Sequence, residues 1–383
     1  MSDRRRISRR TFLGWATAAA VGPYVVASPA VGAARPAPSE RITIGMIGLG
    51  GQGIGRNLRG FLAQPDAQVV AACDVDRDNC YKGKALADQH YARQARGGTF
   101  RGCDPTSDFR EVLGRNDVDA VCISTPDHWH VPMSVMAVRA GKDVICEKPT
   151  LTVGQGRLLA DTVRRYGAVF QTSTEDRSLA VYHRMAEVVR SGRIGKPVRV
   201  RVQLPAGPAT AGDPTPKPVP EGFDWDLWLG PAPWAPYSPA RTHWNFRWIS
   251  DYSGGMLTDW GAHQLDTVQW ALDTEGWVGN AGWSRPVEAS SPEILRTPIG
   301  PGEVRLFTCP AGEHRNFLDC VRTRTDPYQP AEVGHRVASI AHIGNIAMWT
   351  GRRLRWDATA ETFPGDAEAN RYLDRALRAP WAL

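Results

Sequence analysis

The first part of the chain alternates short apolar runs with longer amphipathic segments, a pattern that predicts parallel strands joined by helices. The apolar runs have strand length and few polar residues, which is typical of strands buried on both faces. They lie at residues 42–47, 69–73, 118–124, 143–146 and 168–171. Residues 131–140 and 151–166 are expected to be helices between them. The order predicts an α/β fold, with a doubly wound parallel sheet of Rossmann type in residues 41–166.

A glycine-rich turn, Gly48 to Gly53, follows the first predicted strand directly. Glycines at 48, 50 and 53 give the spacing G-x-G-x-x-G, which binds dinucleotides when it joins a strand to a helix. Gly48 would make the tight turn, Gly50 would let a pyrophosphate approach the backbone, and Gly53 would let the helix pack closely on the strand. A helix that begins here would direct free N–H groups at the phosphates.

An acid ends the second apolar run. Asp74 follows residues 69–73 and lies 21 residues after Gly53. A carboxylate at this position accepts hydrogen bonds from the adenosine ribose hydroxyls and repels a 2′-phosphate. The sequence therefore predicts an NAD site, with NADP less favoured.

Two further predicted strands end in polar loops, one from Thr125 to His130 and one from Glu147 to Pro149. Ligands of open α/β sheets bind at the carboxyl ends of the strands. We therefore expect both loops to lie beside the nicotinamide half of the cofactor.

The second part of the chain, residues 167–383, is expected to form a substrate-binding and oligomerisation domain. Residues 204–220 contain six prolines and should be irregular. Residues 225–283 contain nine of the 14 tryptophans. Such a density fits either a large core packed with indoles or aromatic surfaces that bind sugar rings. The sequence favours neither.

A helix is predicted from Leu257 to Leu272, and it carries one acid and one histidine on the same face. Asp259 and His263 are four residues apart, so the two side chains lie one above the other. An acid there can fix the tautomer of the histidine and raise its basicity. An exposed ion pair is the alternative, but the preceding glycine pair and the flanking tryptophans favour a cleft.

The net charge of +6 comes mostly from one end of the chain, because residues 1–34 contain five arginines and one aspartate. No basic patch elsewhere argues for nucleic acid. Arg9 and Arg10 belong to a twin-arginine pattern, followed by an apolar stretch and small residues, so we expect an export signal cleaved after Ala33 or Ala34. An uncleaved anchor is the alternative. No later segment is apolar enough to span a membrane, and we expect a periplasmic or cell-surface protein.

Seven cysteines, an odd number without a C-x-x-C pair, do not suggest a disulfide framework. His128 and His130 have the spacing of two metal ligands, but no third ligand is nearby in sequence. A loop contact to cofactor or substrate is favoured, and no metal is expected. His335 and His342 share one face of a helix predicted from Glu332 to Thr350 and are interpreted as packing residues.

Residues 48–53 and 147–149, together with Asp259 and His263, resemble the signature of the Gfo/Idh/MocA oxidoreductases. The segments most similar to the exported, twin-arginine members of that family are residues 125–130, 223–230 and 254–263. The resemblance covers nearly all of residues 41–383. It implies a Rossmann domain followed by an α+β domain with an open, mostly antiparallel sheet, which often carries the contacts of a homo-oligomer.

By position, the resemblance implies that Lys148 contacts the nicotinamide ribose and the substrate hydroxyl, that His263 is the general base, and that Asp259 orients the substrate or the histidine. Thr125 and Glu147 would hold the nicotinamide ribose. The candidate cofactor contacts are Gly48, Gly50, Gly51, Gln52, Gly53, Asp74, Thr125, Pro126, His128, His130, Glu147 and Lys148. The candidate substrate contacts are Gln171, Arg177, Trp244, Arg247, Tyr252 and Asp259. Trp244 and Arg247 fit equally a sugar-binding pair or a structural one.

The chain departs from the family pattern in two places. Ser173, Glu175 and Asp176 stand where relatives usually have a glycine and two amides. After Asp273, relatives carry further residues that encode several strands, whereas residues 274–277 here correspond to the far side of that piece. We therefore expect a shortened sheet whose edges need cover. A functional variant, a decayed paralogue and a sequence artefact all fit this shortening.

The sequence predicts an exported NAD-dependent oxidoreductase that transfers hydride between nicotinamide and a hydroxyl of a sugar, polyol or glycoside. Little free cofactor is available outside the cytoplasm, so the nucleotide should be held tightly and recycled by two alternating substrates. One alternative is a glycoside hydrolase that uses bound NAD transiently. The other is a non-catalytic, nucleotide-binding remnant.

Overall fold

The computed structural model describes residues 36–94, 102–273 and 292–383, apart from residues 37, 196, 198 and 209. The predicted export signal in residues 1–34 lies outside the described residues, as do residues 274–277, where the sequence analysis places the shortening.

The six strands of one sheet run parallel in the order β3-β2-β1-β4-β5-β6. The strands are β1 (Ile42–Ile47), β2 (Ala67–Cys73), β3 (Asp104–Thr106), β4 (Ala120–Ile123), β5 (Asp143–Glu147) and β6 (Phe170–Ser173). This is the strand order of dinucleotide-binding folds, so the predicted doubly wound sheet is confirmed. β6 lies beyond residue 166, where the sequence analysis ended the Rossmann domain. The order reverses between β1 and β4, and a ligand crevice is expected at that point.

The helices up to residue 190 are η2 (Pro38–Glu40), η3 (Gly53–Leu58), α2 (Arg59–Leu62), α3 (Arg77–Gln94), α4 (Phe109–Leu113), α5 (Asp127–Arg139), α6 (Val153–Tyr166), η4 (Glu175–Ser178) and α7 (Ala180–Arg190). Those that follow are α8 (Trp225–Leu229), η5 (Pro239–Arg241), η6 (His243–Trp248), α9 (Trp260–Leu272), α10 (Pro292–Arg296), α11 (Glu313–Thr323), α12 (Ala331–Thr350), α13 (Ala367–Asn370) and η7 (Arg371–Leu373).

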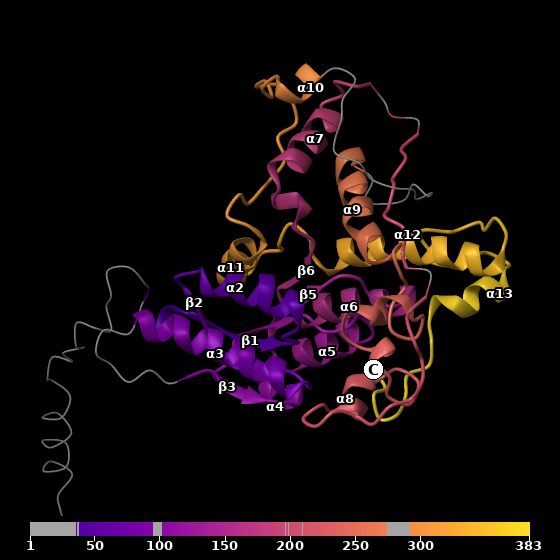
Figure 1. Ribbon diagram of the computed structural model, residues 1–383. Helices are drawn as coiled ribbons and strands as arrows, with labels where there is room; N and C mark the ends of the chain where they lie inside the picture. The colour runs from indigo at the N-terminus through magenta and orange to yellow at the C-terminus, as the bar shows by residue number, and fades with distance from the viewer. Residues whose placement is uncertain are drawn as a thin grey trace, which may run out of the picture.

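Helices cover both faces of the sheet, each face with its own hydrophobic cluster (Figure 1). On one face η3, α2 and α3 pack on β1 and β2, and α11 from the far end of the chain completes the layer. Phe61 of α2 and Phe317 of α11 meet there with ring centroids 6.3 Å apart. On the other face α4, α5 and α6 bury Phe109, Trp129 and Leu159. The core of the sheet therefore includes residues that are remote in sequence.

The C-terminal part of the chain is largely helical where the structure describes it. α9 packs against α7 and α12, and α12 lies on α6. Figure 1 shows α7 and α9 standing away from the sheet, with α12 near their base.

The open, mostly antiparallel sheet expected in the C-terminal part is not observed in the described residues. Antiparallel pairing there is limited to two isolated bridges, Asp76 with Phe223 and Asp357 with Thr362. The described positions of residues 204–220 form no helix or strand, because their prolines lack the N–H groups that a strand ladder needs. The homo-oligomer, whose contacts that sheet was expected to carry, stays a prediction.

Two helices begin at positions that differ from the prediction. α5 begins at Asp127, so much of the loop expected at residues 125–130 forms its first turn. Pro126 precedes it in an extended conformation, and a carboxylate in the first turn is favoured by the helix dipole. α9 begins at Trp260, three residues later than predicted, and Asp259 occupies its N-cap position.

No helix within the described ranges is long and apolar enough to cross a membrane. All seven cysteines are unpaired.

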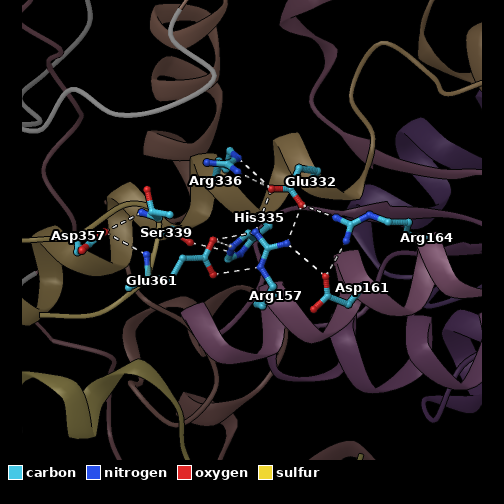
Figure 2. Close-up of polar contacts among 11 residues, drawn as sticks. Arg157, Asp161, Arg164, Glu332, His335, Arg336, Ser339, Asp357 and Glu361 are labelled. Carbon is cyan, nitrogen blue, oxygen red and sulfur yellow. Dashed lines mark hydrogen bonds and ion pairs between the residues drawn. The ribbon is translucent and has the colours of Figure 1, made fainter.

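A charged network joins α6 to α12 (Figure 2). Arg157 donates to both carboxylate oxygens of Glu332, at 2.8 and 2.9 Å, and to both of Glu361, at 2.7 and 3.1 Å. Its hydrogen bond lowers the pKa of Glu332 to about 2. The buried ring of His335 lies 2.8 Å from Glu361, and His342 contacts a backbone carbonyl oxygen at 2.7 Å. The predicted packing role of both histidines is confirmed.

We expect Arg157→Met to lower the free energy of unfolding by about 2 kcal/mol, because two partly buried carboxylates would each lose a partner that donates to both of their oxygens. Arg164→Met is the matched control. Arg164 also pairs with Glu332, but its side chain is 66% exposed, and such pairs contribute only about 0–1 kcal/mol. Urea unfolding followed by circular dichroism measures both changes. Equal losses in the two variants would contradict a central role for Arg157.

Candidate functional site

A cavity of about 750 Å³ lies at the carboxyl ends of β1, β2, β4 and β5. The glycine turn and the strand ends form one wall, and residues of η4, η6 and α9 form the other. The predicted site residues that line it are Gly48, Gly50, Gly51, Gln52, Asp74, Thr125, Pro126, His130, Glu147, Lys148, Trp244, Arg247, Asp259 and His263.

The glycine turn needs glycine at two positions and leaves open space at two others. Gly48 has a φ of +86°, and a Cβ there would lie 2.6 Å from the carbonyl carbon of Ser124. A Cβ on Gly53 would lie 2.0 Å from the carbonyl oxygen of Gly48, so the helix packs closely on the strand as predicted. A Cβ on Gly50 or Gly51 would meet nothing within 4 Å. The turn therefore has room for a pyrophosphate against its backbone.

Asp74, at the end of β2, braces this turn. Its carboxylate accepts hydrogen bonds from the N–H of Leu49 at 2.6 Å and the N–H of Asp76 at 2.8 Å. Burial raises the pKa of Asp74 to about 6. The residue lines the cavity, where an adenosine ribose would lie in a dinucleotide complex.

The ends of β4 and β5 supply further polar groups. Glu147 accepts hydrogen bonds from the side chains of Gln52 and Asn57, both at 3.0 Å, and so ties the end of β5 to the glycine turn. The hydroxyl of Thr125 is buried and has no hydrogen-bond partner among the described residues. The ring nitrogens of His130 each lie 2.8 Å from a backbone carbonyl oxygen. Open space along the turn and a free buried hydroxyl fit a bound dinucleotide.

Lys148, Asp259 and Arg247 form a charged cluster across the cavity. The ammonium of Lys148 donates to the backbone oxygen of Asp259 at 3.1 Å and is paired with its carboxylate. Arg247 donates from Nε to the other carboxylate oxygen at 2.9 Å. Burial acts to raise the pKa of Asp259, but the two cations outweigh burial and hold that pKa below its usual value. Asp259 therefore stays ionised and holds both cations at the cavity.

His263, one turn along α9, is a neutral base at neutral pH. Burial, and then the charge of Lys148, lower the pKa of His263 to about 4. Its Nδ1 is buried, has no hydrogen-bond partner in the described chain, and lies 3.7 Å from a carboxylate oxygen of Glu175. A neutral imidazole can accept a proton, so the geometry suits general-base chemistry.

Two residues of this site were not predicted as functional. Glu175, named from the sequence only as a departure from the family pattern, lies beside His263 and pairs with Arg56 at 2.8 Å. Arg56 also pairs with the buried Glu313 at 2.8 Å. A charged residue just after β6, at the edge where ligands bind, was a usable signal for Glu175. Nothing in the sequence pattern pointed to Arg56.

Five predicted contacts do not line the cavity: Gly53, which packs against the carbonyl oxygen of Gly48, and four residues whose side chains have other partners. His128 is buried, with Nε2 2.9 Å from a backbone oxygen of α8, and the buried Tyr252 packs beside its ring. Gln171 donates to a backbone oxygen at the start of α11 at 3.0 Å. Arg177 donates to both oxygens of Asp266 at 2.7 and 2.9 Å. These partners hold all four side chains within the protein rather than against a ligand.

Among the described residues, no group of three or more His, Cys, Asp or Glu side chains is placed to hold a metal ion.

Two family profiles match this chain. Residues 42–174 match one described as the oxidoreductase family, NAD-binding Rossmann fold. Residues 180–279 and 298–383 match one described as the oxidoreductase family, C-terminal alpha/beta domain. Together they cover most of the sequence.

Several curated relatives match over shorter stretches. A 1,5-anhydro-D-fructose reductase from Ensifer adhaerens is 39% identical over 24% of this chain and 28% of its own length. A glycosyl hydrolase family 109 protein from Saccharopolyspora erythraea is 35% identical over 40% of this chain and 36% of its own length. An inositol 2-dehydrogenase from the same organism is 31% identical over 42% of this chain and 44% of its own length. The matches therefore span less than half of each of these relatives.

Solved structures share the fold at low identity. An oxidoreductase domain protein from Kribbella flavida superposes with a TM-score of 0.54 and 17% identity, over 82% of this chain and 98% of that one. A 3-ketoreductase from Actinomadura kijaniata, solved with NADP and TDP-benzene, superposes with a TM-score of 0.52 and 19% identity. The match covers 82% of this chain and 98% of that one.

The cavity geometry predicts how the pKa of His263 responds to its neighbours. Lys148→Met should raise that pKa from about 4, because it removes a nearby positive charge. Glu175→Gln should lower it further, because it removes a negative charge. NMR titration of ¹⁵N-labelled histidines, with the signal assigned through His263→Gln, measures both shifts. Lys82→Met, on the exposed side of α3, is the control and should leave the pKa unchanged.

The same low pKa makes folding sensitive to acid. An unfolded histidine titrates at about 6.5, so the unfolded chain binds more protons than the folded one between about pH 6.5 and pH 4. His263 therefore reduces stability as the pH falls through that window. A folded-state pKa of His263 near 6.5, a pKa lowered by Lys148→Met, or a pKa raised by Glu175→Gln would contradict the arrangement.

Proposed function

The chain belongs to the Gfo/Idh/MocA oxidoreductase family, and from this we propose that it transfers hydride between NAD and a hydroxyl group of a sugar, polyol or glycoside. The observation that best supports the proposal is that Lys148, from the end of β5, and His263, from α9, line the same cavity as the glycine turn. A cation and a neutral base that face the same dinucleotide cavity match the needs of alcohol oxidation.

Bound NAD would accept the hydride from the carbon that bears the hydroxyl group. The residues of the chain would position that hydroxyl and take its proton. The ammonium of Lys148 has three N–H donors. Two of them bind the backbone and carboxylate oxygens of Asp259, which leaves one donor for the substrate oxygen. With Nδ1 of His263 buried beside Glu175, Nε2 is the nitrogen left to accept the hydroxyl proton. The imidazolium that forms would be stabilised by the carboxylates of Glu175 and Asp259.

Asp74 supports NAD rather than NADP as the cofactor. Its carboxylate lies where the adenosine ribose is expected, and a 2′-phosphate there would meet a negative charge. Arg77, the nearest arginine in sequence, lies outside the residues that line the cavity.

A glycoside hydrolase that uses NAD transiently is the second candidate. The match to a glycosyl hydrolase family 109 protein over 40% of the chain favours it. Both activities need the same cofactor site and the same base. Release of a leaving group without net NADH formation would favour the hydrolase. The intact charged cluster of Lys148, Asp259 and Arg247 argues against a non-catalytic remnant, because a buried ion pair without a use is expensive to retain.

Lys148→Ala and His263→Ala are each expected to lower kcat/KM for sugar-dependent NADH formation by at least about 100-fold, the usual contribution of a placed acid or base. NAD should remain bound in both variants, and more tightly than NADP. NADH absorbance with a carbohydrate panel and calorimetric titration with each nucleotide measure these effects. Lys82→Ala is the control for a lost lysine. Retained turnover in either cavity variant would exclude the assigned roles.

We also propose that the protein is exported by the twin-arginine route, as the pattern at Arg9 and Arg10 supports. Replacement of both arginines by lysine should leave the protein in the cytoplasm, because the export receptor recognises the arginine pair itself. Cell fractionation with immunoblotting measures the distribution. Equal export of the wild type and the variant would contradict the proposal.

A further inference from the structure

A second cavity, of about 490 Å³, adjoins the catalytic one. Trp244 and Trp260 line both cavities, so the two spaces share these two side chains. Trp248 and Met256 extend the apolar wall of the outer cavity. Both indoles are partly exposed, so a ligand held beside Lys148 and His263 could extend over them to the outer cavity.

The tryptophans of this region fall into two groups. Trp225 and Trp228 are buried and stack on each other, with ring centroids 4.8 Å apart. Trp244 and Trp260 are 61% and 46% exposed. An indole exposed in a concave, aromatic surface is typical of a binding site rather than of a core. Of the two roles that the sequence left open, Trp225 and Trp228 fit packing in a core, whereas Trp244 and Trp260 fit a surface that binds a sugar ring.

The lining of the outer cavity selects for a neutral ligand. None of its described lining residues carries a charge, and its hydroxyl and amide side chains are Thr210 and Asn245. A diphosphate or a uronate would find no cation among these lining residues. A sugar ring has an apolar face that stacks on indole and hydroxyls that bond to neutral polar groups, so it matches the lining on both counts.

The elements that form the outer cavity also carry the catalytic cluster. Trp260 follows Asp259 directly and begins α9, which carries His263. Trp244 and Trp248 lie in η6 with Arg247, whose guanidinium carbon lies 4.2 Å from the ring centroid of Trp244 and whose Nε donates to Asp259. A ligand across both cavities would therefore be held by residues of the same two elements, η6 and α9.

We propose that Trp244, Trp248 and Trp260 form an outer subsite for a second, neutral sugar ring joined to the sugar that is oxidised beside Lys148 and His263. The substrate class is then a neutral disaccharide or larger glycoside, rather than a free monosaccharide or a nucleotide-linked sugar. This inference rests on the proposed function for the identity of the inner site, but the outer cavity is described by its own residues.

The test compares single sugars with the disaccharides that contain them, on the full-length, NAD-loaded protein. Glucose is compared with cellobiose and maltose, and galactose is compared with lactose. UDP-glucose is tested as a charged, nucleotide-linked substrate. We expect kcat/KM for at least one disaccharide to exceed that of its monosaccharide by about tenfold, the gain expected from one stacked ring. UDP-glucose should show no such gain.

Trp248→Ala tests the subsite itself, because Trp248 lines only the outer cavity. We expect the ratio of kcat/KM for the disaccharide to kcat/KM for the monosaccharide to fall by about tenfold in Trp248→Ala. Trp248→Phe should largely retain this ratio, because it keeps an aromatic face. The ratio corrects for a general loss of activity. Trp234→Ala is the matched control, because Trp234 is 69% exposed and lines neither cavity.

Binding is measured separately by calorimetry on His263→Ala, so that no sugar is consumed. Tighter binding of a disaccharide that is lost on adding Trp248→Ala supports the subsite, even if no NADH forms with any sugar and the oxidoreductase proposal fails. Oxidation of monosaccharides and disaccharides at equal kcat/KM, or a preference that Trp248→Ala leaves intact, would overturn the subsite while the oxidoreductase proposal stands. A preference for UDP-glucose would also overturn it.

Discussion

The ion pair between Lys148 and Asp259 sets the geometry of the cleft. Lys148 follows β5 of the parallel sheet, and Asp259 is the N-cap of α9 in the C-terminal part of the chain. Their side chains are only 12% and 8% exposed, and buried charges are costly unless they are paired. Because the loss of either residue would leave the other charge buried with one partner fewer, the pair favours an arrangement in which the two walls of the cavity meet at this point. Arg247 completes the pairing of the carboxylate and brings η6 to the same point.

The protonation state of His263 follows from that pairing. The cation that keeps Asp259 ionised also disfavours a second positive charge one helical turn away, and burial acts in the same direction. Glu175 opposes both effects, but it is shared with Arg56, which is itself shared with Glu313. The unprotonated imidazole of His263 beside the ammonium of Lys148 is therefore a consequence of the whole cluster and not of one contact. Removal of any member would change the basicity of the others.

Features set by local spacing could be predicted from the sequence, and features set by distant packing could not. The glycine turn, Asp74, Lys148, Asp259 and His263 each follow from a strand end or a helical repeat, and all of them line or shape the cavity. His128, Gln171, Arg177 and Tyr252, which do not line it, are buried or paired by segments far along the chain, and no spacing rule reveals this.

Three further differences have the same origin. Arg56 reaches Glu175 and Glu313 only because β6, α11 and η3 meet in space. The exposed and buried tryptophans share one stretch of sequence and differ only in what covers them. The antiparallel sheet was an expectation from resemblance, and such a sheet needs partner strands that the described residues do not supply.

The two parts of the chain share one core, and this bears on the shortening that the sequence analysis expects after Asp273. Phe317 and Leu318 of α11 are fully buried in the cluster beneath β1 and β2. Trp381, near the end of the chain, packs on Trp129 of α5 with ring centroids 4.7 Å apart. The residues that form the cavity precede Asp273, whereas these core residues follow the segment in which strands were expected. A shorter C-terminal sheet would therefore remove neither the charged cluster at the cavity nor the packing beneath it, so such a shortening is compatible with an intact site.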